Sequence, residues 1–329
     1  VQFPRMTYDY AMTKYGIDKP DLRIKDLMII TDITDAVKTS EFKVFKDVIN
    51  SGGIIAGIKT GKSQDGSKIE ITRKISDGYT DFAKKLGFGG LATLKVNEDG
   101  SLQSSILKFL NEESIKGLSA AFDAQPGDFI LILSGDKSKV LNGLGQLRLK
   151  IAEDFKLLDD SKHEFVWITD FPLFHYEEEE NRFVGEHHVF TSPKDEFIHL
   201  LDSKDRKEIE SIRANCYDLV YNGNELGSGS IRIHDSETQK KVFRIIGLTD
   251  EEAAEKFGFI LEAFKYGAPP HGGVAFGFDR MIAMLSGTKS IRDIIAFPKT
   301  VSAASLMDNC PSPVIKLQLD ELGIQLKQG

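Results

Sequence analysis

The stretch GGVAFGFDRMIAML, residues 272–285, joins a glycine-rich strand pattern to an apolar helical pattern. With a period of two, Val274, Phe276 and Phe278 fall on one strand face, which we expect to be a core face. The other face carries Gly273, Ala275, Gly277 and Asp279. A strand face without side chains lets another group approach the backbone closely. Either a flat ligand or another piece of the protein fits that description, and the pattern alone does not choose between them.

The composition is that of a globular chain without a membrane span. Of 329 residues, 41% are hydrophobic and 28% are charged, and no run approaches the roughly 18 consecutive apolar residues of a transmembrane helix. The first residues show no signal-peptide pattern. A net charge of −8 leaves only local basic patches for nucleic acid. Cys216 and Cys310 have neither zinc nor disulfide spacing, which favours a reducing cytoplasm.

The spacing of strand and helix patterns predicts an α+β protein with two parts. In residues 30–138, single strands alternate with single helices, as in a small α+β unit with its own core. A long helical pattern follows at 137–158. The remainder, 1–29 and 139–329, is richer in glycine and charge, and we expect there an antiparallel sheet flanked by helices.

Three local signals mark boundaries. Pro20 and its aspartate neighbours predict a linker in YGIDKPDLR, residues 15–23. The run of four glutamates at 177–180 is typical of a solvated loop or hairpin tip. Thr249, followed by three acidic residues, predicts the start of a helix.

The dipeptide Asn222-Gly223 predicts a β-hairpin with a two-residue type I′ turn. We then expect Val220 to pair with Glu225, and Asp218 with Gly227. Asp218 and Glu225 would be diagonal neighbours, with Cβ atoms about 7 Å apart. Two carboxylates this close favour a cation between them, and hard oxygen ligands suit Mg²⁺. The alternative is a hairpin rim with two solvated acids.

Arg232 follows Glu225 by seven residues, so a regular strand would place the two on opposite faces. A bulge at Gly227–Gly229 would bring them to the same face. Arg232 would then offer a planar fork to a carboxylate or phosphate. The alternative is a surface arginine paired with Asp235.

Other familiar sites are absent from the sequence. His187 and His188 are adjacent, so in a strand they point to opposite faces and do not readily share a metal. Neither has the ligand context of catalytic zinc. There is no P-loop and no strand–GxGxxG–helix dinucleotide motif.

Seven ordered stretches together resemble bacterial-type aspartyl-tRNA synthetases of class II. The run from Gly272 to Arg280 resembles motif 3 of the class. The others narrow the match: YGIDKPDLR, WITDFPLF, HHVFTSPKD, YDLVYNGNELGSGSIRIHD, FGFILEAFKYGAPPHGG and IRDIIAFPKT. The resemblance covers essentially the whole chain. It implies that residues 30–138 are the insertion domain of the bacterial-type enzyme, a domain also found in the B subunit of tRNA-dependent amidotransferases.

The resemblance also implies roles for single residues. Arg280 matches the motif 3 arginine that stacks on the adenine of ATP and reaches its phosphates, and Gly277, Phe278 and Asp279 line that site. Glu225 matches the acid that binds ATP through Mg²⁺, and Asp218 fits a second metal-binding carboxylate. Arg232 matches the arginine that holds the aspartate side chain. His187 matches a histidine near the amino acid. Arg280 and Glu225 are the expected catalytic residues.

The activity implied is aspartate–tRNA ligation, with ATP, L-aspartate and tRNA as substrates, in a cytoplasmic enzyme that is a homodimer at full length. The anticodon-binding domain and motifs 1 and 2 are not found in the 329 residues. We therefore expect a fragment that is weak or inactive alone. The choice between aspartate tRNA alone and asparagine tRNA as well depends on the anticodon-binding domain. Two alternatives are a non-catalytic tRNA-binding or regulatory paralogue, and a class II ligase that uses aspartate or asparagine without tRNA.

Overall fold

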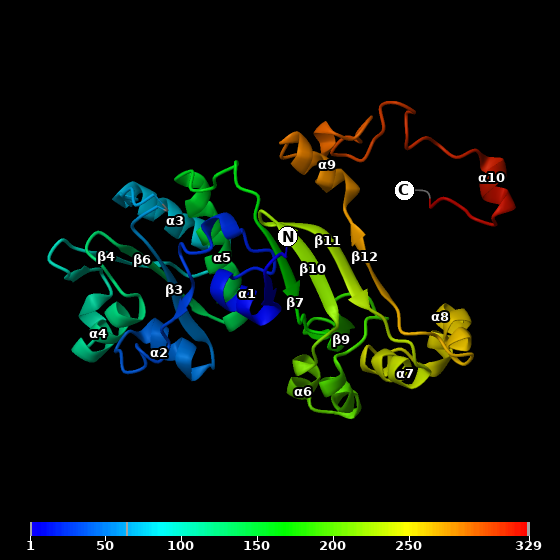
Figure 1. The fold of residues 1–329 in the computed structure, drawn as a ribbon, viewed down its shortest axis with the longest axis horizontal. Coiled ribbons are helices and arrows are strands. Elements are labelled where there is room, and N and C mark those ends of the chain that lie inside the picture. The colour runs from blue at the N-terminus through cyan, green and yellow to red at the C-terminus, as the bar shows by residue number, and fades with distance from the viewer. Residues whose placement is uncertain (1, 64, 328–329) are drawn as a thin grey trace. The chain divides into compact units, whose positions relative to one another are not determined.

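The computed structural model describes residues 2–63 and 65–327. The chain divides into two compact units, residues 1–275 and 276–329, which are described separately. The first unit contains two larger β-sheets and a two-stranded hairpin (Figure 1). The mixture of antiparallel strands and flanking helices confirms the predicted α+β class.

The first sheet has the strand order β1-β7-β10-β11-β12. Its strands are β1 (Arg5–Thr7), β7 (Phe165–Thr169), β10 (Cys216–Tyr221), β11 (Asn224–Ile231) and β12 (Gly272–Phe276). The β7–β10 and β10–β11 pairs are antiparallel, as predicted, whereas β1 pairs with β7 in parallel. Val166, Ile168, Cys216 and Val220 contribute one face of this sheet to a buried cluster.

The second sheet has the order β2-β3-β6-β4-β5, and its strands all lie between residues 31 and 135. They are β2 (Thr31–Asp32), β3 (Ile54–Thr60), β4 (Ala92–Val96), β5 (Leu102–Gln103) and β6 (Phe129–Gly135). Successive β6 residues point to opposite faces: Ile130 and Ile132 enter one cluster, Leu131 and Leu133 the other. Because both faces are covered, the strand reads as a continuous apolar run.

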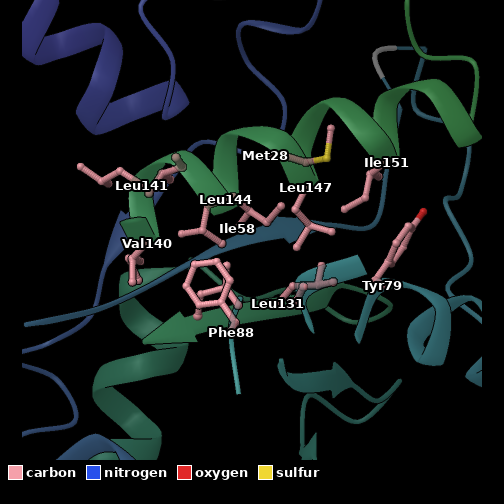
Figure 2. Packing of buried hydrophobic residues seen from close by; sticks show 14 of the residues in the cluster. Met28, Ile58, Tyr79, Phe88, Leu131, Val140, Leu141, Leu144, Leu147 and Ile151 are labelled. Atoms are coloured by element: carbon pink, nitrogen blue, oxygen red, sulfur yellow. The ribbon is translucent and has the colours of Figure 1, made fainter. Parts of the chain in front are cut away.

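Helices cover the two faces of this second sheet. The cluster that contains Ile130 and Ile132 also includes Phe45 of α2 (Lys43–Asn50) and Leu118 of α4 (Glu112–Ala121). On the other face, α5 (Lys137–Asp154) and α3 (Arg73–Lys85) pack over β3 and β6 (Figure 2). The helix α5 presents Val140, Leu144, Leu147 and Ile151 to that face.

The two glycines inside α5 lie at close contacts. A Cβ on Gly143 would lie 2.5 Å from the ring of Phe88, on the side of the second sheet. A Cβ on Gly145 would lie 2.8 Å from the carbonyl oxygens of Tyr15 and Gly16. Tyr15 ends α1 (Tyr8–Tyr15), and Gly16 is its left-handed cap with φ of 70°. The glycines, which are poor helix formers, therefore let α5 contact α1 and the second sheet at once.

Arg148 connects the same helix to the segment after α1. Its side chain is fully buried and donates to the carbonyls of Ile24 and Leu27, the latter at 3.1 Å. Its guanidinium carbon lies 4.9 Å from the centre of the Tyr15 ring. Burial lowers the pKa of Arg148 to about 10. The segment 24–27 is thereby attached to α5.

The remaining elements of the first unit surround the first sheet. The hairpin of β8 (Phe174–Glu177) and β9 (Arg182–Gly185) places the glutamate run at its tip, as predicted. Aromatic contacts of Phe190 and Phe257 with Phe243 join α7 (Ser236–Ile245) to α8 (Asp250–Phe264). Thr249 caps α8 in a capping box with Glu252, which confirms the predicted helix start. The other elements are η1 (Leu22–Ile24), η2 (Leu107–Phe109), η3 (Asp195–Asp202) and α6 (Arg206–Ser211).

The stretch 272–285 forms the predicted strand and helix, but its apolar face is not a core face. Val274, Phe276 and Phe278 are 43%, 48% and 71% exposed. The prediction was wrong because no element among the described residues packs over that face, and all five residues of β12 are exposed. A Cβ on Gly273 would meet no atom within 4 Å, so the glycine face is open as well.

The described part of the second unit, residues 276–327, consists of short helices and loops. Its elements are α9 (Phe278–Ser286), η4 (Ile291–Asp293) and α10 (Lys316–Glu321). The left-handed Gly287 ends α9, with φ of 66°. Among the described helices of the whole chain, none is both long and apolar enough to cross a bilayer.

Candidate active site

The hairpin of β10 and β11 has the predicted turn. It also has a β-bulge, but at a different residue from the one that the sequence predicted. Asn222 and Gly223 both have positive φ, 45° and 79°, as a type I′ turn requires. Val220 pairs with Glu225, as expected. The register then shifts, so Leu219 pairs with Gly227 and Asp218 with Ser228. The predicted pairing of Asp218 with Gly227 is therefore wrong.

The register shift is a bulge at Leu226, not at Gly227–Gly229 as predicted. Leu226 is the residue without a partner on β10, and its side chain is buried. Gly227 and Gly229 belong to the regular ladder. Gly229 has a different reason to be glycine, because a Cβ there would lie 2.1 Å from the Gly273 carbonyl oxygen of β12. The glycine therefore permits close approach of the edge strand.

The bulge nevertheless has the predicted consequence for the two site residues. Directly paired residues of a sheet point to the same face. Glu225 therefore shares a face with Val220 and Asp218, and after the bulge Ser228 and Ser230 return to it. Arg232 follows Ser230 at the spacing of that face. One sheet face thus carries Asp218, Glu225 and Arg232.

Asp218 is the most deeply buried acid of this face, at 3% exposure. Its Oδ1 atom has no hydrogen-bond partner in the described structure. Burial raises the pKa of Asp218, and the charge of Glu225 adds to the rise. A hydrogen bond from Ser228 and the charges of His187 and Lys19 act in the opposite direction. The unpartnered oxygen is the feature that a cation or a donor would satisfy.

Glu225 lies next to a lysine that the sequence analysis did not select. The Lys19 Nζ atom is 3.4 Å from Glu225 Oε2 and 3.3 Å from Asp18 Oδ2. YGIDKPDLR was interpreted as a linker and as one of the stretches that carry the family resemblance, but no role was assigned to Lys19, which is distant from Glu225 in the sequence. A proline between charged residues gives no sign of a partner in another element.

The segment that carries Lys19 is fixed beneath the hairpin turn. Asp21 is 3% exposed and accepts hydrogen bonds from the backbone and side chain of Arg23, at 2.7–3.2 Å. Arg23 also pairs with Asp160 at 2.8 Å. A Cβ on Gly223 would lie 3.3 Å from that of Asp21. The turn and the segment are therefore in contact.

Arg232 is held by its backbone, and its side chain keeps an unused donor. Its N–H donates to the His271 carbonyl at 2.9 Å. The buried Nη1 has no hydrogen-bond partner in the part of the chain that is described. The alternative partner, Asp235, instead accepts the backbone N–H of Thr238 and caps α7. An ion pair between Arg232 and Asp235 is not formed among the described residues.

A buried thiol is close to both charges of this face. Burial and the charge of Asp218 raise the pKa of Cys216 to about 12, while the charge of Arg232 opposes the rise. Cys216 lies two residues before Asp218 on β10, and its partner across the ladder is Ser230. The high pKa keeps Cys216 a neutral thiol at neutral pH.

His187 and His188 lie in a bend between β9 and η3 and not in a strand. The His187 ring contacts Phe171, with ring centres 4.7 Å apart, and its charge acts on Asp218. His188 accepts the N–H of Phe190 at 3.3 Å. Burial and the charge of Arg232 lower the pKa of His188. The two histidines therefore have different surroundings, as the sequence indicated, although the backbone is a bend.

The four predicted nucleotide-site residues, Gly277–Arg280, form the start of α9. Gly277 precedes the helix as its N-cap, and Asp279 lies in its first turn. Phe278, Asp279 and Arg280 are exposed. Arg280 belongs to the second unit, so it is described with its own helix.

The acidic pair has the chemistry of a magnesium site with few protein ligands. Within residues 2–63 and 65–327, no group of three or more His, Cys, Asp or Glu side chains is arranged to hold a metal. Mg²⁺ commonly uses one or two carboxylates and takes its other ligands from water and phosphate. Asp218, with its unpartnered buried oxygen, and Glu225 fit that ligand set.

The chain as a whole matches a known class of proteins. The family of class II tRNA synthetases (D, K and N) matches residues 1–301. This chain belongs to that family.

Curated relatives are more specific. The chain is 49% identical over 326 residues to an aspartate–tRNA(Asp/Asn) ligase of Persephonella marina, which covers 98% of this chain and 53% of the relative. It is 50% identical over 326 residues to an aspartate–tRNA ligase of Clostridium tetani, with the same two coverages. The chain therefore spans about half the length of the curated relatives it matches. A solved aspartyl-tRNA synthetase of Entamoeba histolytica is 18% identical, covers 76% of this chain and 44% of its own, and has a TM-score of 0.33.

Proposed function

We propose that this chain is part of an aspartate–tRNA ligase. Such an enzyme activates L-aspartate with ATP to aspartyl-adenylate and pyrophosphate, and then transfers the aspartyl group to the 3′ end of tRNA. The observation that carries the proposal is the sheet face that holds Asp218, Glu225 and Arg232 together. The identity of about half of all positions to curated aspartate ligases supports it.

In this proposal each candidate residue has one task. Arg232 binds the side-chain carboxylate of aspartate through its guanidinium fork, and His187 lies beside the amino acid. Glu225 and Asp218 hold Mg²⁺ with ATP. Arg280, with Gly277, Phe278 and Asp279, binds the adenine and the phosphates.

The chemistry requires little proton transfer by side chains. The carboxylate of aspartate attacks the α-phosphorus of ATP, and the residues of the site align the two and neutralise charge. Mg²⁺, when bound, supplies charge neutralisation on the phosphates. Arg232 orients the amino acid, and Arg280 orients the nucleotide.

We further propose that residues 30–138 are the insertion domain, and that 1–29 with 139–329 belong to the catalytic domain. The strands of the second sheet, all between 31 and 135, support this division. The proposed domain boundary at residue 138 does not coincide with a boundary in packing, because α5 contributes to the core of the second sheet. We also propose that the full-length protein is a cytoplasmic homodimer that uses tRNA.

Binding of non-hydrolysable adenylate analogues to the 329-residue chain tests this function. We expect tighter binding of the aspartyl analogue than of the asparaginyl analogue, together with weak ATP–pyrophosphate exchange by the chain alone. A non-catalytic paralogue would bind neither analogue. A ligase that does not use tRNA would bind the aspartyl analogue but show no interaction with aspartate tRNA. Equal affinity for both analogues would contradict the proposed specificity.

The metal assignment has a separate test in Glu225→Gln. The change removes one of two carboxylate charges, so we expect Mg²⁺·ATP to bind on the order of tenfold more weakly. Isothermal titration at fixed Mg²⁺ measures the loss. Glu237→Gln is the matched control, because Glu237 is exposed on α7 and pairs with Lys240. Equal affinities of the two variants would remove Glu225 from the metal site.

A further inference from the structure

Lys19 lies on a short segment that is anchored at both ends. Before it, Gly16 caps α1 and contacts Gly145 of α5. After it, Pro20 and Asp21 are buried, and Asp21 accepts a hydrogen bond from the Arg23 side chain. The lysine is therefore presented to Glu225 by a fixed backbone and does not reach it from a mobile loop.

The surroundings of Lys19 favour its charged form. Burial opposes the charge, but the carboxylates of Asp18 and Glu225 outweigh burial and raise the pKa of Lys19. The side chains of Lys19 and Glu225 are 35% and 31% exposed, so the pair is partly screened by water. The charge of Lys19 also acts on Asp218. One ammonium group is therefore paired with Glu225 and acts electrostatically on Asp218, the two carboxylates of the proposed metal site.

We propose that Lys19 competes with the divalent cation for Glu225. This inference rests on the proposed function, because it takes Asp218 and Glu225 as the metal ligands. A cation that binds both carboxylates must replace the contact of 3.4 Å between Lys19 and Glu225. The ammonium then remains beside Asp18, at 3.3 Å. Lys19 thus weakens the affinity of the acidic pair for a metal that arrives without nucleotide.

This competition gives the site a preference for metal that is already bound to nucleotide. A bare cation brings only its own charge to the pair and is repelled by Lys19. Metal that arrives with nucleotide also brings phosphate oxygens, which can accept hydrogen bonds from the displaced ammonium group. Lys19 is therefore a positioning and selectivity residue. It differs from the proposed ligands in that its removal strengthens binding of the bare ion.

The direct test measures Mn²⁺ binding to the 329-residue chain without nucleotide. Mn²⁺ accepts the same hard oxygen ligands as Mg²⁺, and its free form is counted by electron paramagnetic resonance. For Lys19→Met we expect Mn²⁺ to bind about five- to tenfold more tightly at low salt, with a smaller gain at high salt. Lys25→Met is the matched control, because Lys25 is exposed and the net charge changes equally.

Further variants separate the possible results. Lys19→Gln is a second neutral variant in case Lys19→Met does not fold, as judged by circular dichroism. Lys19→Arg keeps the charge and should retain the weak affinity. Affinity that is unchanged or lower in the neutral variants, relative to Lys25→Met, overturns the competition. If Glu225→Gln leaves Mn²⁺ binding unchanged in every background, the proposed metal site itself fails, and the inference fails with it.

Discussion

Replacing Arg232 with leucine is expected to abolish the preference for aspartate over asparagine. In the proposed complex the guanidinium makes two charge-assisted hydrogen bonds with the aspartate carboxylate. Asparagine would place its amide N–H₂ against guanidinium donors and leave a buried charge unpaired. Sites built around such a polar contact reject the wrong ligand by roughly 10⁴-fold. Arg232→Leu should therefore lose most affinity for the aspartyl-adenylate analogue and keep that for ATP.

The measurement compares the aspartyl and asparaginyl analogues on the same chain. Arg232→Lys keeps the charge but loses the planar fork, so an intermediate preference is expected. Arg244→Leu is the matched control, since Arg244 is largely exposed at the end of α7. Strong aspartate preference in Arg232→Leu would show that another residue determines specificity.

Gly145→Ala is expected to destabilise the first unit despite the better helix propensity of alanine. The new Cβ would lie 2.8 Å from two carbonyl oxygens of α1 and its cap, and these backbone atoms cannot move aside by rotation. Overpacking of this kind costs about 1–3 kcal/mol. The free energy of unfolding in urea measures the loss.

Gly78→Ala provides the matched control for this substitution. Gly78 is also inside a helix, α3, but a Cβ there meets no atom within 4 Å. We expect a gain of about 0.5–1 kcal/mol at this position. If Gly145→Ala were also stabilising, the contact between α1 and α5 would be looser than described.

The elements that the sequence predicted well depend on local chemistry. Asn222-Gly223 predicts its turn because both residues tolerate positive φ, and Thr249 predicts a helix start because its hydroxyl reaches a nearby N–H. The short continuous apolar runs of β3 and β6 likewise indicate buried strands within their own length. In each case, the determining contacts lie a few residues apart.

The features that the sequence did not predict depend on contacts between distant segments. Nothing near Leu226 marks it as the bulge, because its position depends on how β11 pairs with β10. The contact between Lys19 and Glu225 joins residues more than 200 positions apart. The apolar face of β12 was predicted to be buried from its period alone, which does not reveal whether another element packs over that face.

For the candidate site, the sequence predicted a shared face for Asp218, Glu225 and Arg232, and the register agrees. The reason given was partly wrong, since the bulge lies one residue earlier than the glycines. The roles of these residues, and those of His187 and Gly277–Arg280, stay predictions. They depend on bound substrates, which a pattern of side chains does not contain.

The bulge at Leu226 constrains the number of residues in this segment more strictly than the identity of those residues. An odd separation between Glu225 and Arg232 places both on one face only because one residue is left out of the ladder. Substitutions along β11 change single side chains, whereas the loss or gain of one residue would invert the orientation of the rest of the strand. Homologous chains that keep this site should therefore vary here in residue identity but not in residue number.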